Sequence, residues 1–157
     1  MATTKLTIAM ELLDRALRLY YEGDSDFSSL HLAGAAEEII GTYLTKLGKT
    51  STFHETRSFI TEVANRFDAE DDDCSDIPTE VVTTKTVHDL MAYAKNNTKH
   101  MSTSETGLIA FDPRAEVRYI LDRVVADYYR LIDHLAIEET TLIRRFNQEL
   151  LASTKSS

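Results

Sequence analysis

The stretch that decides the fold runs from Leu30 to Gly41 and reads LHLAGAAEEIIG. It lies in a helix that the sequence predicts to start near Ser25 or Asp26 and to end at Gly48. Apolar residues fill about half of the circumference of this helix, which indicates a central helix packed on more than one side. Gly34 and the two alanines after it are small, so another helix can approach closely there.

Helical periodicity also marks the neighbouring segments. A first helix is expected from about Thr4 to Tyr21, and Gly23 ends it. A third helix is expected to begin at Thr52 with Glu55 three residues on, the pattern of a capping box in which each side chain satisfies the other's free backbone N–H. Its apolar stripe comprises Thr56, Ile60, Val63 and Phe67.

The C-terminal half predicts two or three more helices. A fourth is expected over residues 84–98, and a short extended piece near 108–111 follows it. Asp112 caps a fifth helix with Pro113 at its first position, and apolar residues continue it to Leu135. The remaining apolar positions, 142–150, belong either to a bent extension or to a sixth helix, and we favour a break near residues 137–141.

Length and composition place the chain among single globular domains. It has 157 residues, 43% of them hydrophobic, with only two Pro and five Gly, which excludes collagen and wholesale disorder. A single cysteine excludes a disulfide framework and a Cys-based zinc site within one chain. We expect an all-α domain over residues 1–152, an up-and-down bundle of five or six helices, followed by a frayed tail at 153–157.

Charge and targeting signals narrow the function classes. The chain carries 17 basic and 26 acidic residues, a net charge of −9, which argues against a general nucleic-acid coat but leaves room for a small local basic site. The start lacks the features of a signal peptide, and no apolar run approaches the roughly 20 residues of a membrane span. We therefore expect a soluble cytoplasmic protein with no membrane partner.

Metal, cofactor and nucleophile chemistry finds little support. Six acids lie between Asp68 and Ile77, but a Ca²⁺ loop would need a glycine at its turn and a closing glutamate, so a solvated loop is favoured. Cys74 lies inside this acidic run, which disfavours its thiolate. His134 and Glu138 are one helical turn apart and fit half a metal site or an exposed pair, of which we favour the pair. No metal and no cofactor is expected.

Glu37 is the first residue that suggests a site. Its position on the wheel lies within the apolar arc of the central helix, so its carboxylate lies either at the rim of that arc or buried beside a partner. The rim is the commoner place for a glutamate. Glu38 falls on the polar face with His31 and Thr42.

A second candidate cluster closes the fourth helix. The six residues Lys95 to His100 contain two cations, two amides and an imidazole, and Asn96 and His100 are one turn apart on one face. Cations and asparagines are also ordinary at a helix C-terminus, which gives the cluster a purely structural reading. The functional reading is a small site for a phosphate, with His100 as an acid or base. We expect Lys95, Asn96, Lys99 and His100 to line a groove with Glu37 or Glu38.

Two segments resemble the HEPN domains, small helical bundles of toxin–antitoxin, defence and RNA-processing proteins. The stretch 30–41 looks like the Ala-Ala-Glu core helix of that family, and a short linker and a helix start bearing His54 follow it. Residues 95–100 stand where the family carries an Arg, a polar residue and a His. The long helix after residues 111–113 is similar to the closing helix of such bundles.

The resemblance implies two functions. In catalytic HEPN domains the Arg and His of two protomers meet across a dimer interface and cleave RNA without metal. By this resemblance His100 corresponds to the catalytic histidine and Asn96 to the polar residue, whereas Lys95 replaces the arginine. A lysine lacks the planar fork with which a guanidinium grips phosphate. Other members act as binding or dimerising modules without nuclease activity.

We therefore predict first a non-catalytic HEPN-like helical homodimer that binds a partner protein, or a nucleotide or short RNA. Its ligand-binding residues are expected to be Glu37, Glu38, Lys95, Asn96, Lys99 and His100. The alternative is a metal-independent ribonuclease, a toxin or defence effector, with His100, Lys95 and Asn96 as catalytic residues. A helical bundle without any ligand site comes third.

Overall fold

The computed structural model describes residues 2–70, 81–100 and 107–154, and in these stretches the backbone forms seven helices and no strand. The expectation of an all-α fold is confirmed. The helices are α1 Lys5–Glu22, α2 Asp26–Lys46, α3 Thr52–Glu70, α4 Thr84–Met91, α5 Tyr93–Asn97, α6 Pro113–Ile132 and α7 Thr141–Thr154.

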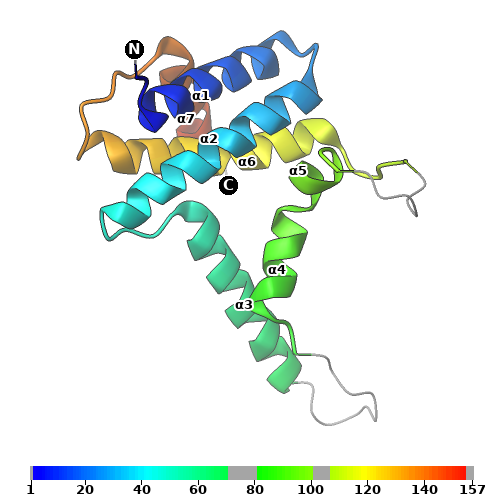
Figure 1. Ribbon diagram of the computed structural model, residues 1–157. Coiled ribbons are helices and arrows are strands. Elements are labelled where there is room, and N and C mark those ends of the chain that lie inside the picture. The colour runs from blue at the N-terminus through cyan, green and yellow to red at the C-terminus, as the bar shows by residue number, and fades with distance from the viewer. Residues whose placement is uncertain (1, 71–80, 101–106, 155–157) are drawn as a thin grey trace.

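The core lies among four of the helices. Figure 1 shows α1, α2, α6 and α7 grouped together, with α1 and α2 as antiparallel neighbours across a short turn. α2 packs against α1 on one side and α6 on the other, as expected for a central helix. The largest fully buried side chains come from all four helices: Leu13, Leu17, Leu30, Ile40, Leu44, Val117, Leu121, Val124, Tyr128, Leu131, Ile143 and Phe146.

Local signals fix several helix ends. Gly23, with φ +75°, ends α1, and its N–H donates to the Leu19 carbonyl at 2.9 Å. Gly48 follows α2 with φ +70°. Only glycine adopts such angles without strain. At the start of α6, Asp112 Oδ1 accepts from the backbone N–H groups of Arg114 and Ala115 at 2.9 and 3.3 Å, which confirms the predicted cap.

The C-terminal half differs in detail from the expectation. The fourth helix is divided at Ala92 into α4 and α5, although the Ala92 N–H still donates to the His88 carbonyl at 3.0 Å, so the division is a bend in an almost continuous helix. Residues 108–111 lie outside the helices without forming a strand. α6 ends at Ile132, and α7 is a separate helix after a non-helical stretch at 133–140. α7 includes residues 153 and 154 of the expected tail, and 155–157 lie outside the described residues.

The start of α3 corrects the predicted capping box. Thr52 does begin the helix, but its backbone N–H and its hydroxyl both donate to Asp127 Oδ1 on α6, at 2.8 and 2.6 Å. Glu55 instead pairs with Arg130 at 2.7 Å. A buried carboxylate on another helix therefore takes over from the predicted pair, alongside the Ser51 hydroxyl, which accepts from the His54 N–H at 3.4 Å. The capping box fails because tertiary partners on α6 outcompete the neighbours in sequence.

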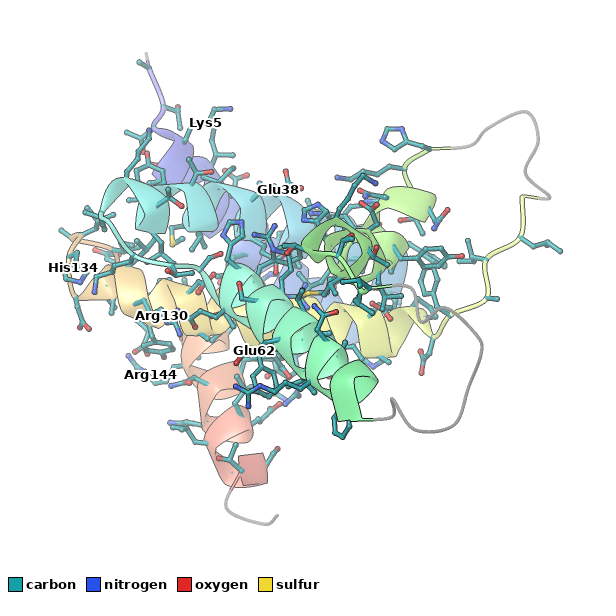
Figure 2. The ribbon with its side chains drawn as sticks, turned by 90° about the horizontal axis from the view of Figure 1, so that it is seen from below. Lys5, Glu38, Glu62, Arg130, His134 and Arg144 are labelled. Carbon is teal, nitrogen blue, oxygen red and sulfur yellow. The ribbon has the colours of Figure 1, made fainter. Side chains whose placement is uncertain are left out.

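α3 and α4 form an arm that extends away from the four-helix group (Figure 1). Its base is held by α6, where Arg130, labelled in Figure 2, contacts both Glu55 and the Thr50 carbonyl. Further out, the Asn65 side chain donates to the Val82 carbonyl at 3.1 Å and joins the two helices of the arm. α5 then returns to α2, so the fold is not a simple up-and-down bundle. α3 continues through Glu70, and the rest of the acidic stretch, from residue 71, lies outside the described residues.

Candidate functional site

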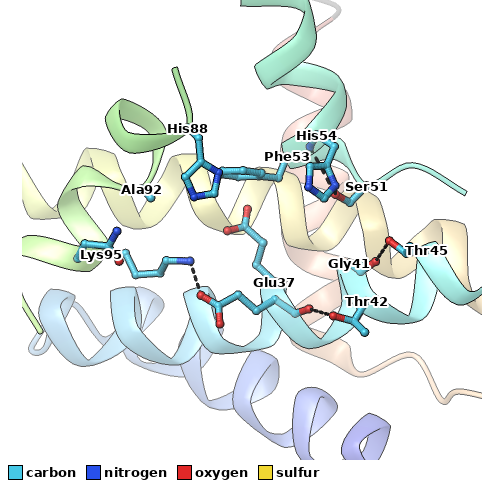
Figure 3. A pocket seen from close by; sticks show the side chains of 12 residues that line it. Glu37, Gly41, Thr42, Thr45, Ser51, Phe53, His54, His88, Ala92 and Lys95 are labelled. Atoms are coloured by element: carbon cyan, nitrogen blue, oxygen red, sulfur yellow. Dashed lines mark hydrogen bonds and ion pairs between the residues drawn. The ribbon is translucent and has the colours of Figure 1, made fainter. Parts of the chain in front are cut away.

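A pocket of about 450 Å³ lies where the base of the arm meets α2 (Figure 3). α2 forms one wall, and the start of α3 together with α4 and α5 forms the opposite wall. This volume falls in the usual range for small-molecule sites. The lining residues are Glu37, Glu38, Gly41, Thr42, Thr45, Ser51, Phe53, His54, His88, Ala92, Lys95 and Asn96.

Glu37 is the buried acid of the α2 wall. Its residue is only 4% exposed, and its Oε1 accepts from Arg123 Nε of α6 at 2.7 Å. Of the two positions that the sequence leaves open, the structure shows the buried one with a partner. The cation is required because a lone buried carboxylate would cost several kcal/mol. The same guanidinium lies 5.5 Å from the centre of the Phe53 ring, so one arginine supports both walls.

Lys95 is held by two features of α2. Its ammonium donates to Glu38 Oε1 at 2.6 Å (Figure 3), and its aliphatic stem lies against Gly34. A Cβ added at Gly34 would come within 2.6 Å of Lys95 Cδ, a clash for any larger residue. The sequence predicted that another helix approaches closely at Gly34, and in the structure the Lys95 side chain makes that approach. Lys95 is 9% exposed, so its charge is committed to Glu38 and is shielded from solvent.

Two histidines and a phenylalanine form the opposite wall. Phe53 makes edge contacts with both imidazoles, at 5.9 Å to His54 and 5.3 Å to His88 between ring centres. His54 Nδ1 lies 3.1 Å from the Ser51 hydroxyl, which fixes the ring. His88 Nδ1 is buried and has no hydrogen-bond partner among the residues that the structure describes. In Figure 3 the two imidazoles lie on either side of the Phe53 ring.

Sequence patterns did not predict this second wall. His54 entered only as the mark of a helix start, and His88 and Phe53 carried no role. The available signal was weak: Phe53 and His54 directly follow the predicted helix start at Thr52, and His88 lies two turns before Lys95 on the predicted fourth helix. No sequence pattern near these residues predicts that α3 and α4 fold back to face α2.

The structure brings four of the six predicted ligand-binding residues together and leaves two apart. Glu37, Glu38, Lys95 and Asn96 line the pocket, whereas Lys99 and His100 do not, and both are exposed. Lys99 lies near His31 of α2, and burial together with the positive charge of Lys99 lowers the pKa of that imidazole. The basic residues that follow α5 therefore lie beyond the pocket, near His31 in the N-terminal half of α2.

The arrangement suits binding of a polar ligand. Each acid of the α2 wall has a cation partner, so the pocket holds fixed dipoles and little net charge. The described side chains contain no group of three or more His, Cys, Asp or Glu placed to hold a metal ion. The pocket offers an aromatic ring, two imidazoles and the Asn96 amide to a ligand that carries hydrogen-bonding groups on a flat ring.

Comparisons with known proteins give no match: no family model, no curated protein and no solved structure matches the chain. The resemblance to HEPN domains therefore stays a prediction from the sequence. Among the described helices, none is both long and apolar enough to cross a bilayer.

Proposed function

We propose that this chain is a non-catalytic, HEPN-like helical module that acts as a homodimer and binds a nucleotide or the end of a short single-stranded RNA. The observation that carries the proposal is the ion pair between Lys95 and Glu38, 2.6 Å long and shielded on the lysine side. A catalytic phosphate contact needs a cation that is free to meet the phosphate. The Lys95 ammonium is not free in this way, because it is paired with the Glu38 carboxylate.

The pocket favours a base over a phosphate. A phosphate placed beside Lys95 would face the carboxylates of Glu37 and Glu38 and would have to displace the latter. A nucleobase has no charge, and it brings hydrogen-bond donors and acceptors that the Asn96 amide and the imidazoles match. Phe53 supplies the apolar ring beside which a base fits.

The phosphate then belongs at the exposed residues that follow α5. Lys99 and His100 are exposed, and the salt bridges found among the described residues include neither of them. A nucleotide with its base in the pocket and its phosphate beside Lys99 and His100 would contact both groups of residues that the sequence predicts to bind a ligand. Binding of this kind is compatible with a net charge of −9, because a short strand needs only the local positive charge beside its phosphate.

A filling substitution tests the pocket without touching the core. Thr42 lines the pocket, is exposed, and its hydroxyl bonds only within its own helix, to the Glu38 carbonyl. We expect Thr42→Phe to weaken binding of a short fluorescent single-stranded RNA at least about tenfold, measured by anisotropy, because the ring occupies the space of the base. The matched control is Gln148→Phe at an exposed position of α7, which should leave affinity unchanged.

The same samples separate the ribonuclease alternative. After incubation the RNA is run on a denaturing gel, and we expect it to be intact with the wild-type chain. Cleavage that His100→Ala abolishes, and that Lys95→Arg keeps or raises, would replace the binding proposal with the ribonuclease. RNA that neither binds nor is cleaved would overturn both readings.

A further inference from the structure

The two acids of the α2 wall each commit one oxygen to a cation and leave the other for a ligand. Glu38 Oε1 accepts from the Lys95 ammonium at 2.6 Å, and Glu37 Oε1 accepts from Arg123 Nε at 2.7 Å. Among the residues that the structure describes, no hydrogen bond or ion pair involves the Oε2 atom of either acid. A carboxylate accepts hydrogen bonds and donates none, so these oxygens require N–H or O–H donors on the ligand.

Lys95 and Glu38 place a donor directly beside these acceptors. The ammonium has three N–H donors and uses one of them on Glu38, so it can donate again without leaving its partner. The Lys95 side chain is 10% exposed and packs against Gly34, which holds the ammonium in place. The Glu38 side chain is 61% exposed, and both residues line the pocket (Figure 3). A ligand therefore meets a positioned N–H donor next to an accessible carboxylate.

This order of groups matches the Watson–Crick edge of guanine. That edge carries the acceptor O6, then the N1–H donor, then the N2 amino group, so an ammonium can donate to O6 while a carboxylate accepts from both nitrogens. Adenine and cytosine place an acceptor nitrogen beside their amino group, and uracil has one N–H between two carbonyl groups. Each of these three bases would turn a lone pair toward the carboxylate and leave it without a donor.

Glu37 adds to this discrimination. In Figure 3 its side chain extends from α2 toward Phe53 and His88, so a second carboxylate faces the space of the base. An acceptor nitrogen placed there lies opposite negative oxygens, which opposes binding of the wrong base. The volume of about 450 Å³ admits the two rings of a purine beside Phe53.

We infer that the pocket is specific for guanine, which the Lys95–Glu38 pair recognises through its Watson–Crick edge. The inference rests on the proposed function, because it names the base of the bound nucleotide or RNA end. O6 accepts from Lys95 Nζ, and N1–H and the N2 amino group donate to the Glu38 carboxylate. The ion pair stays intact in the complex, so the shielded ammonium keeps its acid.

Calorimetric titration of the wild-type chain with nucleoside monophosphates tests the base without any substitution. The ligands are GMP, AMP, CMP and IMP, of which IMP has the O6 and N1–H of guanine but lacks the amino group. We expect GMP to bind most tightly, IMP about tenfold more weakly, and AMP and CMP more than tenfold more weakly, because a well-placed bidentate contact to a base edge discriminates by this order.

A substitution of the acid tests which residue reads the base. Glu38→Gln keeps the length of the side chain, removes one acceptor oxygen and its charge, and adds an amide that also fits adenine. We expect the preference for GMP over AMP to fall at least about tenfold. The matched control is Glu62→Gln on α3, whose side chain is also 61% exposed and pairs with Arg66 outside the pocket. It should keep the preference, and circular dichroism checks that both variants remain helical.

Short RNA distinguishes a free nucleotide from the end of a strand. Two fluorescent five-nucleotide RNAs, one with guanine at both ends and one with adenine at both ends, are compared by anisotropy with the wild-type chain. A guanine-ended strand that binds more tightly than GMP assigns the site to an RNA end. GMP that binds more tightly than either strand assigns it to a free guanine nucleotide.

The outcomes separate this inference from the proposed function. Monophosphates that bind with equal affinity whatever their base overturn the specificity for guanine and keep nucleotide binding. Equal affinities for GMP and IMP contradict the contact with the amino group, and a preference that Glu38→Gln leaves unchanged contradicts recognition by this pair. If no monophosphate and neither strand binds, both the specificity and the proposed function are overturned.

Discussion

Arg123 Nε donates a hydrogen bond to Glu37 Oε1 at 2.7 Å and joins α6 to α2 at the pocket. The side chains of both residues are largely buried, at 14% and 5% exposed. A buried pair adds little net stability compared with apolar residues of the same size, but it costs much to break. The pair therefore fixes where α2 presents its carboxylates, and the pocket depends on it.

Breaking this pair should destabilise the chain strongly. Arg123→Ala leaves Glu37 buried and unpaired, and we expect the free energy of unfolding to fall by about 3–5 kcal/mol in urea denaturation. The matched control is Arg18→Ala, which removes an exposed pair with Asp14 and should cost under about 1 kcal/mol. Similar losses in the two variants would show that Glu37 and Arg123 do not interact as described.

The cap that Asp127 provides gives a second prediction. Burial raises the pKa of its carboxyl, while its Oδ1 accepts two hydrogen bonds from Thr52. We expect Asp127→Ala to lower the free energy of unfolding by about 1–3 kcal/mol, because the start of α3 loses its acceptor. Asp127→Asn keeps an acceptor of the same shape without the buried charge and should lose less. If both variants lost the same amount in urea denaturation, the charge rather than the acceptor would matter.

Local chemistry in the sequence predicts much of the fold. Gly23 and Asp112 end and begin helices through backbone angles and hydrogen bonds made by their near neighbours, so a short window contains the whole cause. Glu37 marks one wall of the pocket in the same way, because a carboxylate within an apolar arc requires an explanation. Its partner Arg123 is 86 residues away, and no periodicity connects the two.

The second wall shows the same limit. Phe53 and His88 meet only because α3 and α4 fold back on each other, and spacing within either helix does not encode that contact. Lys95 lines the pocket, but its stem lies against Gly34 on another helix, and spacing within either helix does not encode that contact. The capping box at Thr52 was wrong because the Thr52 N–H and hydroxyl donate to Asp127, while the Glu55 carboxylate pairs with Arg130.

The contact between Gly34 and Lys95 gives a third prediction. In an otherwise wild-type chain, Gly34→Ala places a methyl 2.6 Å from Lys95 Cδ, which forces the lysine off Glu38 and lowers stability. In a Lys95→Ala background the clash disappears, and the same change should stabilise α2 by up to about 1 kcal/mol, the preference of a helix for Ala over Gly. Thermal unfolding of all four chains measures this coupling, and additive effects would contradict the contact.

His31 gives a pH-dependent prediction. Burial first, and then the charge of Lys99, hold its pKa below the ordinary value of 6.5, while a hydrogen bond to the Thr98 backbone opposes them. The unfolded chain binds the proton more readily, so stability is full above pH 6.5 and is lost as the pH falls toward the folded-state pKa. Lys99→Gln removes one cause and should raise the pKa of His31 in an NMR titration. Lys85→Gln, at an exposed lysine paired with Asp89, should leave it unchanged.

The most direct test of the proposed function is a ¹⁵N–¹H NMR titration of the full chain with nucleoside monophosphates. Binding of a base in the pocket should shift the backbone signals of Gly41, Thr42 and Asn96, while a phosphate at the residues that follow α5 should shift that of Lys99. Signals of α7 should stay in place and serve as the internal control. If the monophosphates leave the pocket signals unmoved, or shift only residues outside the pocket, the assignment of this site to nucleotide binding is contradicted.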